Sequence, residues 1–341
     1  MSADNSCADV SVPLRNLLNS VQCVRDRVKG SYVNGVTSFL YRYVYHLDTQ
    51  AVKAASQEAT KLSLAFSKPP LPTQEDGEKF AESIHKSVLA LSTVYYWLPK
   101  SDGITLRRLV RDATAEVLDG IVQLVDVIVS SPLQSLSQEQ LQSTGGVWSA
   151  CDQFAHLPRD NREAVLGVLA SYIGVVKDAI EEMEQAQAES QDPFSDVLDD
   201  EDQDSRGNQD TYWSEEDRQL MAPCQGLMKA SAACLRKLLS AVKANGNVSM
   251  PETVAQLDDL ADIAKEISPS VDDLVLSLYP PMDYSGVDQN VSVLYFDTAF
   301  LSSSLRVSHV CLEADLNWVQ FLNGALDHNL QKIKALIQGS S

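Results

Sequence analysis

Histidine and glutamate at helical spacing are the residues in this chain that could hold a metal ion. Glu82 and His85 form an E-x-x-H pair, the spacing used by di-iron four-helix bundles, because residues i and i+3 share one face of a helix. Such a site needs a second E-x-x-H pair and two further glutamates. The second pair is missing, because the residues three before the other four histidines are Tyr43, Gln153, Arg306 and Ala325. We therefore expect no metal site and no cofactor.

Motifs that carry phosphate or nucleophilic chemistry are also missing from the sequence. It contains neither G-x-x-x-x-G-K-[ST] nor G-x-G-x-x-G, and it has no G-x-S-x-G or H-E-x-x-H. None of the six cysteines forms a C-x-x-C pair, and their gaps are long and irregular, which favours free thiols. We expect a protein that is not an enzyme.

The charge balance excludes one large class of partners. The 341 residues include 27 Lys and Arg against 47 Asp and Glu, which gives a net charge of −20. Affinity for duplex DNA comes from neutralising phosphates with Lys and Arg, so we expect no direct nucleic-acid binding. No apolar run approaches the roughly 20 residues of a spanning helix, and the first ten residues lack the pattern of a signal peptide. The sequence predicts a soluble intracellular protein without a membrane partner, cytoplasmic and nuclear.

Apolar residues recur at steps of three and four along most of the chain, which predicts an all-α fold. The longest such stripe consists of Leu106, Leu109, Val110, Ala113, Val117, Ile121, Leu124 and Ile128. Thr73 and Ser214 are typical N-caps of helices that follow them. The best strand candidate, residues 291–296, fits a buried helix equally well, and we expect helices over about 293–311 and 314–338. The pattern predicts two bundles of four to five helices.

An acidic segment separates the two predicted bundles. Residues 181–217 contain fifteen Asp and Glu against the single cation Arg206. A segment with so few large apolar residues cannot bury enough surface to offset the entropy of ordering it. We therefore predict an N-terminal helical bundle over 1–187, an acidic disordered linker over 188–212 and a C-terminal helical bundle over 213–341.

Three arginines on one predicted helix are candidates for binding a partner. Arg107, Arg108 and Arg111 could contact a phosphorylated or acidic protein, since guanidinium groups bind such anions well. The alternative is an ordinary solvated helix face with i, i+4 pairs such as Arg108 with Asp112. The sequence favours the second interpretation.

Tyr212 and Trp213 lie at the edge of the acidic segment and could form a linear docking motif. Trp213 could equally be a hydrophobic staple that packs on the first turn after the Ser214 cap. Both interpretations stay open. Ser214 is followed by three acidic residues, which suits an acid-directed kinase, and a phosphate there is predicted to strengthen the helix cap.

Four stretches of the sequence form a recognisable set: VYYWLPKSDGITLRRLVRDAT (94–114), PRDNREAV with KDAIEEMEQA (158–186), DTYWSEEDRQL (210–220) and VAQLDDLADIAKEISPSVDDLVLSLYPPM (254–282). Together they resemble one protein family, the cyclin-D1-binding proteins. The resemblance implies an all-helical, non-enzymatic protein that binds D-type cyclins and restrains cyclin-dependent kinase signalling toward the retinoblastoma protein. It also implies helix-loop-helix transcription regulators as partners. No Arg/Lys-rich stretch precedes an amphipathic helix here, so such a complex would be incompetent to bind DNA.

A second class of function fits the helical pattern without the resemblance. A structural adaptor of the adhesion or cytoskeletal type is also built from long helical bundles. Such an adaptor would bind acidic or filament surfaces through basic faces, and a net charge of −20 disfavours that. The sequence thus favours a regulatory interaction protein over the adaptor.

Overall fold

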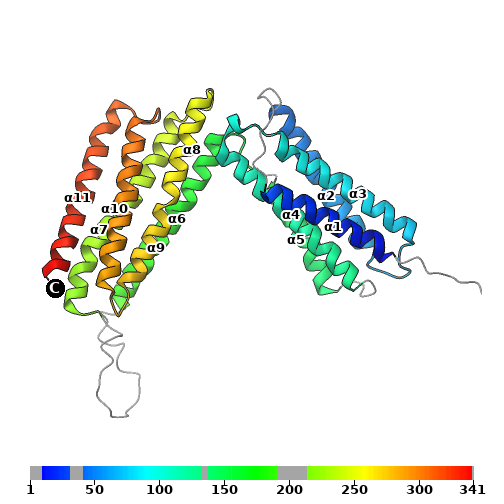
Figure 1. Cartoon of the computed structure of the whole chain (residues 1–341), viewed down its shortest axis with the longest axis horizontal. Coiled ribbons are helices and arrows are strands. Elements are labelled where there is room, and N and C mark those ends of the chain that lie inside the picture. The colour runs from blue at the N-terminus through cyan, green and yellow to red at the C-terminus, as the bar shows by residue number, and fades with distance from the viewer. Residues whose placement is uncertain (1–9, 31–40, 132–136, 155, 190–212, 340–341) are drawn as a thin grey trace, which may run out of the picture. The chain divides into compact units, whose positions relative to one another are not determined.

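The computed structural model describes residues 10–30, 41–131, 137–154, 156–189 and 213–339. Within those residues every regular element is an α- or 3-10 helix and none is a strand (Figure 1). The all-α prediction is therefore confirmed. The strand candidate at 291–296 lies inside a helix, because apolar residues on two sides of a helix also produce a short continuous apolar run.

The chain forms two compact units, Met1–Ala164 and Val165–Ser341. The helices of the first unit are α1 (Ser11–Gly30), α2 (Tyr41–Ala65), α3 (Gln74–Trp97), α4 (Ile104–Ser130) and α5 (Gln138–Phe154), with the short 3-10 helix η2 (Lys100–Asp102) before α4. Its core contains Val21, Leu62, Leu91, Leu118 and Ile121, each at most 1% exposed. The apolar stripe of α4 that the sequence predicts faces this core.

The second unit is also a helical bundle. Its helices are α6 (Asn161–Glu189), which enters this unit at Val165, α7 (Glu215–Asn245), α8 (Pro251–Lys265), α9 (Ile267–Leu278), α10 (Tyr284–Val307) and α11 (Leu316–Gly339), with the 3-10 helix η5 (Glu313–Asp315) before α11. Only Glu266 separates α8 from α9, so these two helices follow one another with hardly a break. Leu227, Leu235, Leu257, Leu274 and Leu294 are completely buried in its core.

Helix α6 corrects the predicted boundary between the bundles. Its residues Val165, Leu169, Val176 and Met183 are completely buried in the core of the second unit. The first bundle therefore does not extend to residue 187, as the sequence analysis expected. The reason is that an apolar stripe shows which face of a helix is buried but not which bundle receives it.

The position of the acidic segment changes with that correction. Residues 190–212, nearly all of the predicted linker, lie outside the residues that the structure describes. The segment runs from α6 to α7, and both helices pack in the core of the second unit. In chain order it connects two helices of one unit rather than one unit to the other.

Helix α10 starts nine residues before the predicted position. Asp283 caps it, because its carboxylate accepts hydrogen bonds from the backbone N–H groups of Ser285 and Gly286 at 3.1 and 3.0 Å. The polar first turn hides this start from an analysis of apolar periodicity.

The start of α4 depends on a residue 55 positions away. Gly103 is the N-cap and has no side chain to accept a bond, so the backbone N–H of Leu106 donates instead to Oδ1 of Asn161 at 3.0 Å. Asn161 is fully buried. Gly103 has φ +120°, and a Cβ there would overlap the Asn161 side chain, so only glycine fits. Both residues of this bond lie in the first unit, which includes the first four residues of α6.

Substitution Asn161→Ala is expected to lower the free energy of unfolding of the first unit by about 1–3 kcal/mol, because a buried N–H of α4 loses its acceptor. Urea unfolding followed by circular dichroism measures the change. Thr73→Ala is the matched control, since it removes the exposed, local cap of α3. A loss for Asn161→Ala no larger than for Thr73→Ala would contradict this account.

Candidate interaction surfaces

The three arginines of α4 do not share one exposed surface. Arg107 is buried, and its guanidinium lies over the ring of Tyr95, 5.2 Å from the ring centre. Arg108 is exposed, while the half-buried Arg111 pairs with its neighbour Asp112 at 2.8 Å. The cation–π contact of Arg107 stabilises the packing of α4 on α3. The structure therefore does not bring the trio together as one anion-binding cluster.

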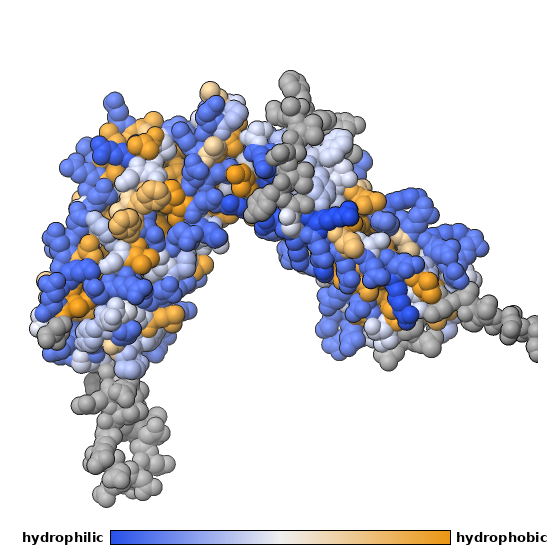
Figure 2. All heavy atoms as spheres, viewed as in Figure 1, coloured by the Kyte–Doolittle hydropathy of each residue, from blue (hydrophilic) through white to orange (hydrophobic). Residues whose placement is uncertain are grey.

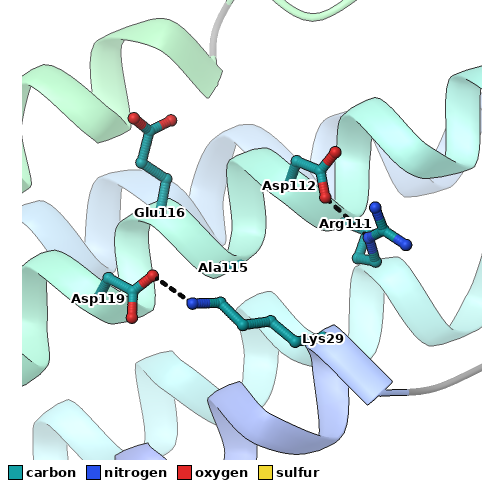
Figure 3. Close-up of a pocket in the computed structure, with 6 residues that line it drawn as sticks. All are labelled: Lys29, Arg111, Asp112, Ala115, Glu116 and Asp119. Atoms are coloured by element: carbon teal, nitrogen blue, oxygen red, sulfur yellow. Dashed lines mark hydrogen bonds and ion pairs between the residues drawn. The ribbon is translucent and has the colours of Figure 1, made fainter.

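Arg111 lines a hollow of about 470 Å³ between α1 and α4 (Figure 3). Lys29 reaches across it to Asp119 at 2.8 Å, and Figure 3 shows Glu116 pointing away from both cations. Its lining holds two cations and three carboxylates, so the hollow as a whole does not favour a phosphate. The ion pair between Lys29 and Asp119 connects α1 to α4.

Trp213 is an internal anchor rather than an exposed docking residue. It is 8% exposed, and its indole N–H donates to the carbonyl oxygen of Leu278 at 2.7 Å. Its ring is tilted against that of Tyr279, with 6.1 Å between centres. A hydrophobic staple would contact Arg218, the fourth helical residue, whereas Trp213 packs at the end of α9. Tyr212 lies outside the described residues.

Ser214 is the N-cap of α7, as the sequence predicts, and the structure shows that it forms a capping box with Asp217. Its hydroxyl accepts from the N–H of Asp217 at 3.1 Å, and the Asp217 carboxylate accepts from the N–H of Ser214 at 2.8 Å. The hydroxyl of Tyr284 donates to the same carboxylate. Burial and this bond raise the pKa of Tyr284 to about 12. Ser214 is exposed, and its phosphorylation remains a prediction.

A groove between α8 and α10 is the surface that the sequence analysis missed. It has a volume of about 450 Å³. Leu260 and Ile263 of α8 line one side of the groove, and Phe300 and Val307 of α10 line the other. Asp259, an acidic residue of α8, also lines it. The available signal was the composition of α10, which carries large apolar residues on the face opposite its core residues as well. A helix with apolar residues on two faces has a second face to cover after the first is buried in the core.

His309 lies beside this groove and fixes the chain after α10. Gln256 Oε1 accepts from the backbone N–H and from Nδ1 of His309, at 3.0 and 2.8 Å. Nε2 accepts from the N–H of Asn247 at 3.2 Å, so both ring nitrogens are used by the neutral imidazole. Burial lowers the pKa of His309. This arrangement favours the neutral form.

Glu82, Cys224 and Cys234, which could take part in metal or thiol chemistry, are in an ion pair or packed in the core. Glu82 of the E-x-x-H pair forms an ion pair with Lys86 at 2.7 Å, and no metal-binding group of three or more His, Cys, Asp or Glu occurs within the described residues. Burial raises the pKa of Cys224 and of Cys234 to about 12, which suits packing rather than reaction. Among the same described residues, no helix is long and apolar enough to span a membrane.

Comparison of the sequence with known proteins identifies the family of this chain. Residues 49–189 match the N-terminal model described as Grap2 and cyclin-D-interacting, and residues 198–298 match the C-terminal one. The chain belongs to the Grap2 and cyclin-D-interacting family. It is 60% identical to "Cyclin-D1-binding protein 1 homolog" of Danio rerio over 100% of both chains. It is 41% identical to "Cyclin-D1-binding protein 1" of Homo sapiens, covering 95% of this chain and 93% of the relative.

The Grap2 and cyclin-D-interacting family models divide the chain differently from its compact units. The models part between residues 189 and 198, close to the boundary at 187 drawn from the sequence. The compact units part between Ala164 and Val165. From Val165 on, helix α6 thus belongs to the N-terminal model by sequence and to the second unit by packing.

Trp213→Ala is expected to destabilise the second unit by about 3 kcal/mol, because it removes a buried ring and an indole hydrogen bond. Urea unfolding provides the measurement. Trp97→Ala is the control, since Trp97 is 46% exposed and its loss is expected to cost less than about 1 kcal/mol. Equal stability of the Trp213 variant and the wild type would return this residue to the docking interpretation.

His309 is expected to make stability depend on pH in one direction. The folded-state pKa of His309 lies below the unfolded value of about 6.5. The stability that its neutral form contributes is therefore fully present above that pH. The contribution is lost as the pH falls through the folded pKa. Urea midpoints at pH 7.5 and 5.5 should therefore differ more for the wild type than for His309→Gln, which cannot titrate. Identical shifts in both proteins would refute this role.

Proposed function

We propose that this protein is a non-enzymatic regulatory protein that binds D-type cyclins. The observation that carries the proposal is the 60% identity, over the full length of both chains, to a relative named for binding cyclin D1. Two helical units without a recognised catalytic motif in the sequence suit a protein that acts by contact with partners.

Sequestration is the mechanism that we infer. A protein bound to the cyclin occupies surface that the cyclin-dependent kinase or its substrate would use, and so restrains signalling toward the retinoblastoma protein. The same protein antagonises basic helix-loop-helix regulators by forming complexes that lack one basic region, since recognition needs basic helices in the major groove. Both activities suit residence in the cytoplasm and the nucleus.

Calorimetric titration of the full chain with a purified D-type cyclin tests the first step. We expect a dissociation constant in the micromolar range or tighter, equivalent to at least about 8 kcal/mol. A variant without residues 191–209 leaves α6 and α7 complete and shows whether the acidic segment helps or hinders binding. Because this segment carries seven acidic residues and one arginine, any contribution from it should shrink between low and moderate salt.

A mitotic cyclin is the control for specificity. No heat with the D-type cyclin from either variant would refute direct binding and bring the structural adaptor forward. If binding occurs, stoichiometric protein should lower phosphorylation of the retinoblastoma protein by the cyclin-dependent kinase. An unchanged phosphorylation rate would refute restraint while leaving cyclin binding intact.

A further inference from the structure

The outer face of α10 carries a stripe of exposed large apolar side chains. Val293, Phe296, Phe300 and Val307 are 44%, 74%, 57% and 82% exposed. Their spacing of 3, 4 and 7 residues puts them along one side of the helix. Figure 2 shows hydrophobic side chains interrupting the hydrophilic surface over this part of the second unit. Contiguous exposed apolar surface of this kind marks an interaction site.

Helix α8 turns that stripe into one wall of a groove. Leu260 is buried and Ile263 half-buried, and together with Phe300 and Val307 they line the hollow of about 450 Å³. The exposed carboxylates of Asp259 and Asp262 also line it, on the α8 side. The groove therefore has apolar surface and a negative edge.

We propose that this groove binds an amphipathic helix of a partner protein that carries Lys or Arg along one flank. An apolar face with residues at i, i+3 or i+4, and i+7 matches the stripe of α10, as in other helix-in-groove complexes. The basic flank then lies against Asp259 and Asp262, which provides complementary charge. From Val293 to Val307 the stripe is about 21 Å long at 1.5 Å per residue, which fits a partner helix of about four turns.

Charge disfavours the two occupants that this chain itself could supply. The segment 190–212 contains eight acidic residues and one arginine, so it would bring like charge to Asp259 and Asp262. A second copy, with a net charge of −20, would do the same. Like charges brought together at an interface cost binding free energy. A partner with a basic helix is the occupant that the groove favours. This inference goes beyond the proposed function, since it is defined by the groove and does not depend on a cyclin.

Binding of a designed helical peptide to the full-length protein tests the proposal. The probe is an 18-residue fluorescent peptide with leucines at i, i+3, i+4 and i+7 and lysines along one flank, and its partner probe carries glutamates instead. We expect the lysine peptide to bind by fluorescence anisotropy and the glutamate peptide to bind roughly tenfold more weakly or not at all.

Two pairs of variants locate the binding on the surface. Phe296→Ser with Phe300→Ser should weaken the lysine peptide roughly tenfold, while Phe321→Ser, an equally exposed phenylalanine on α11, should leave it unchanged. Asp259→Asn with Asp262→Asn should weaken it roughly threefold. Glu181→Gln with Glu182→Gln on α6 is the control with the same change in net charge. All four positions of the acidic variants are exposed, and circular dichroism checks that each variant is folded.

Three outcomes would overturn the proposal. Equal binding of both peptides would refute the charge complementarity. Peptide binding that the phenylalanine pair does not weaken would place the site elsewhere. A dimer of the free protein in sedimentation velocity, abolished by the phenylalanine pair, would assign the groove to a second copy of the chain.

Discussion

The attachment of the inner face of α10 to α7 is the constraint on which the second unit's surface depends. Thr298 and Ser231 are completely buried, and their hydroxyl oxygens lie 2.8 Å apart in a hydrogen bond. A polar pair in an apolar core is costly unless both members are satisfied, so this bond specifies the rotation of α10 about its axis. Once that rotation is set, Phe296 and Phe300 must point away from the core.

Helix α11 holds the same rotation from a second side. Ser302 donates to Asn323 at 2.8 Å, and Tyr295 donates to Asp327 at 2.7 Å. These bonds occupy the side of α10 between its core face and its exposed stripe. The outer apolar face is therefore a consequence of how α10 is anchored, not a surface free to turn inward.

The sequence predicts the helices well, because each bundle buries one stripe per helix and the period of that stripe is local information. The N-cap at Ser214 is equally local information and is confirmed. The unit in which α6 packs is not decided by local information. Its stripe would bury as well against either bundle, and the choice depends on surfaces contributed by α7 and other distant helices.

The candidate sites were harder to predict for a related reason. Arg107 and Trp213 are of residue types that often contact partners, yet their surroundings are supplied by Tyr95 and Leu278 from other helices. For the exposed stripe of α10, the residue types mislead prediction in the opposite direction. Phenylalanine and valine at helical spacing are typical of a core, and only the arrangement in three dimensions shows that a second apolar face stays uncovered.

The corrected place of the acidic segment connects these observations. Because residues 190–212 join α6 to α7, their charge is tethered at both ends to the second unit, which also carries the α8–α10 groove. The field of such charge acts over about a Debye length, roughly 8–10 Å in moderate salt, and a negative field favours the approach of a basic partner such as the one proposed for the groove. The same sign of charge disfavours occupation of the groove by the segment itself. Attraction of a basic partner and exclusion of the chain's own acidic segment thus follow from one distribution of charge.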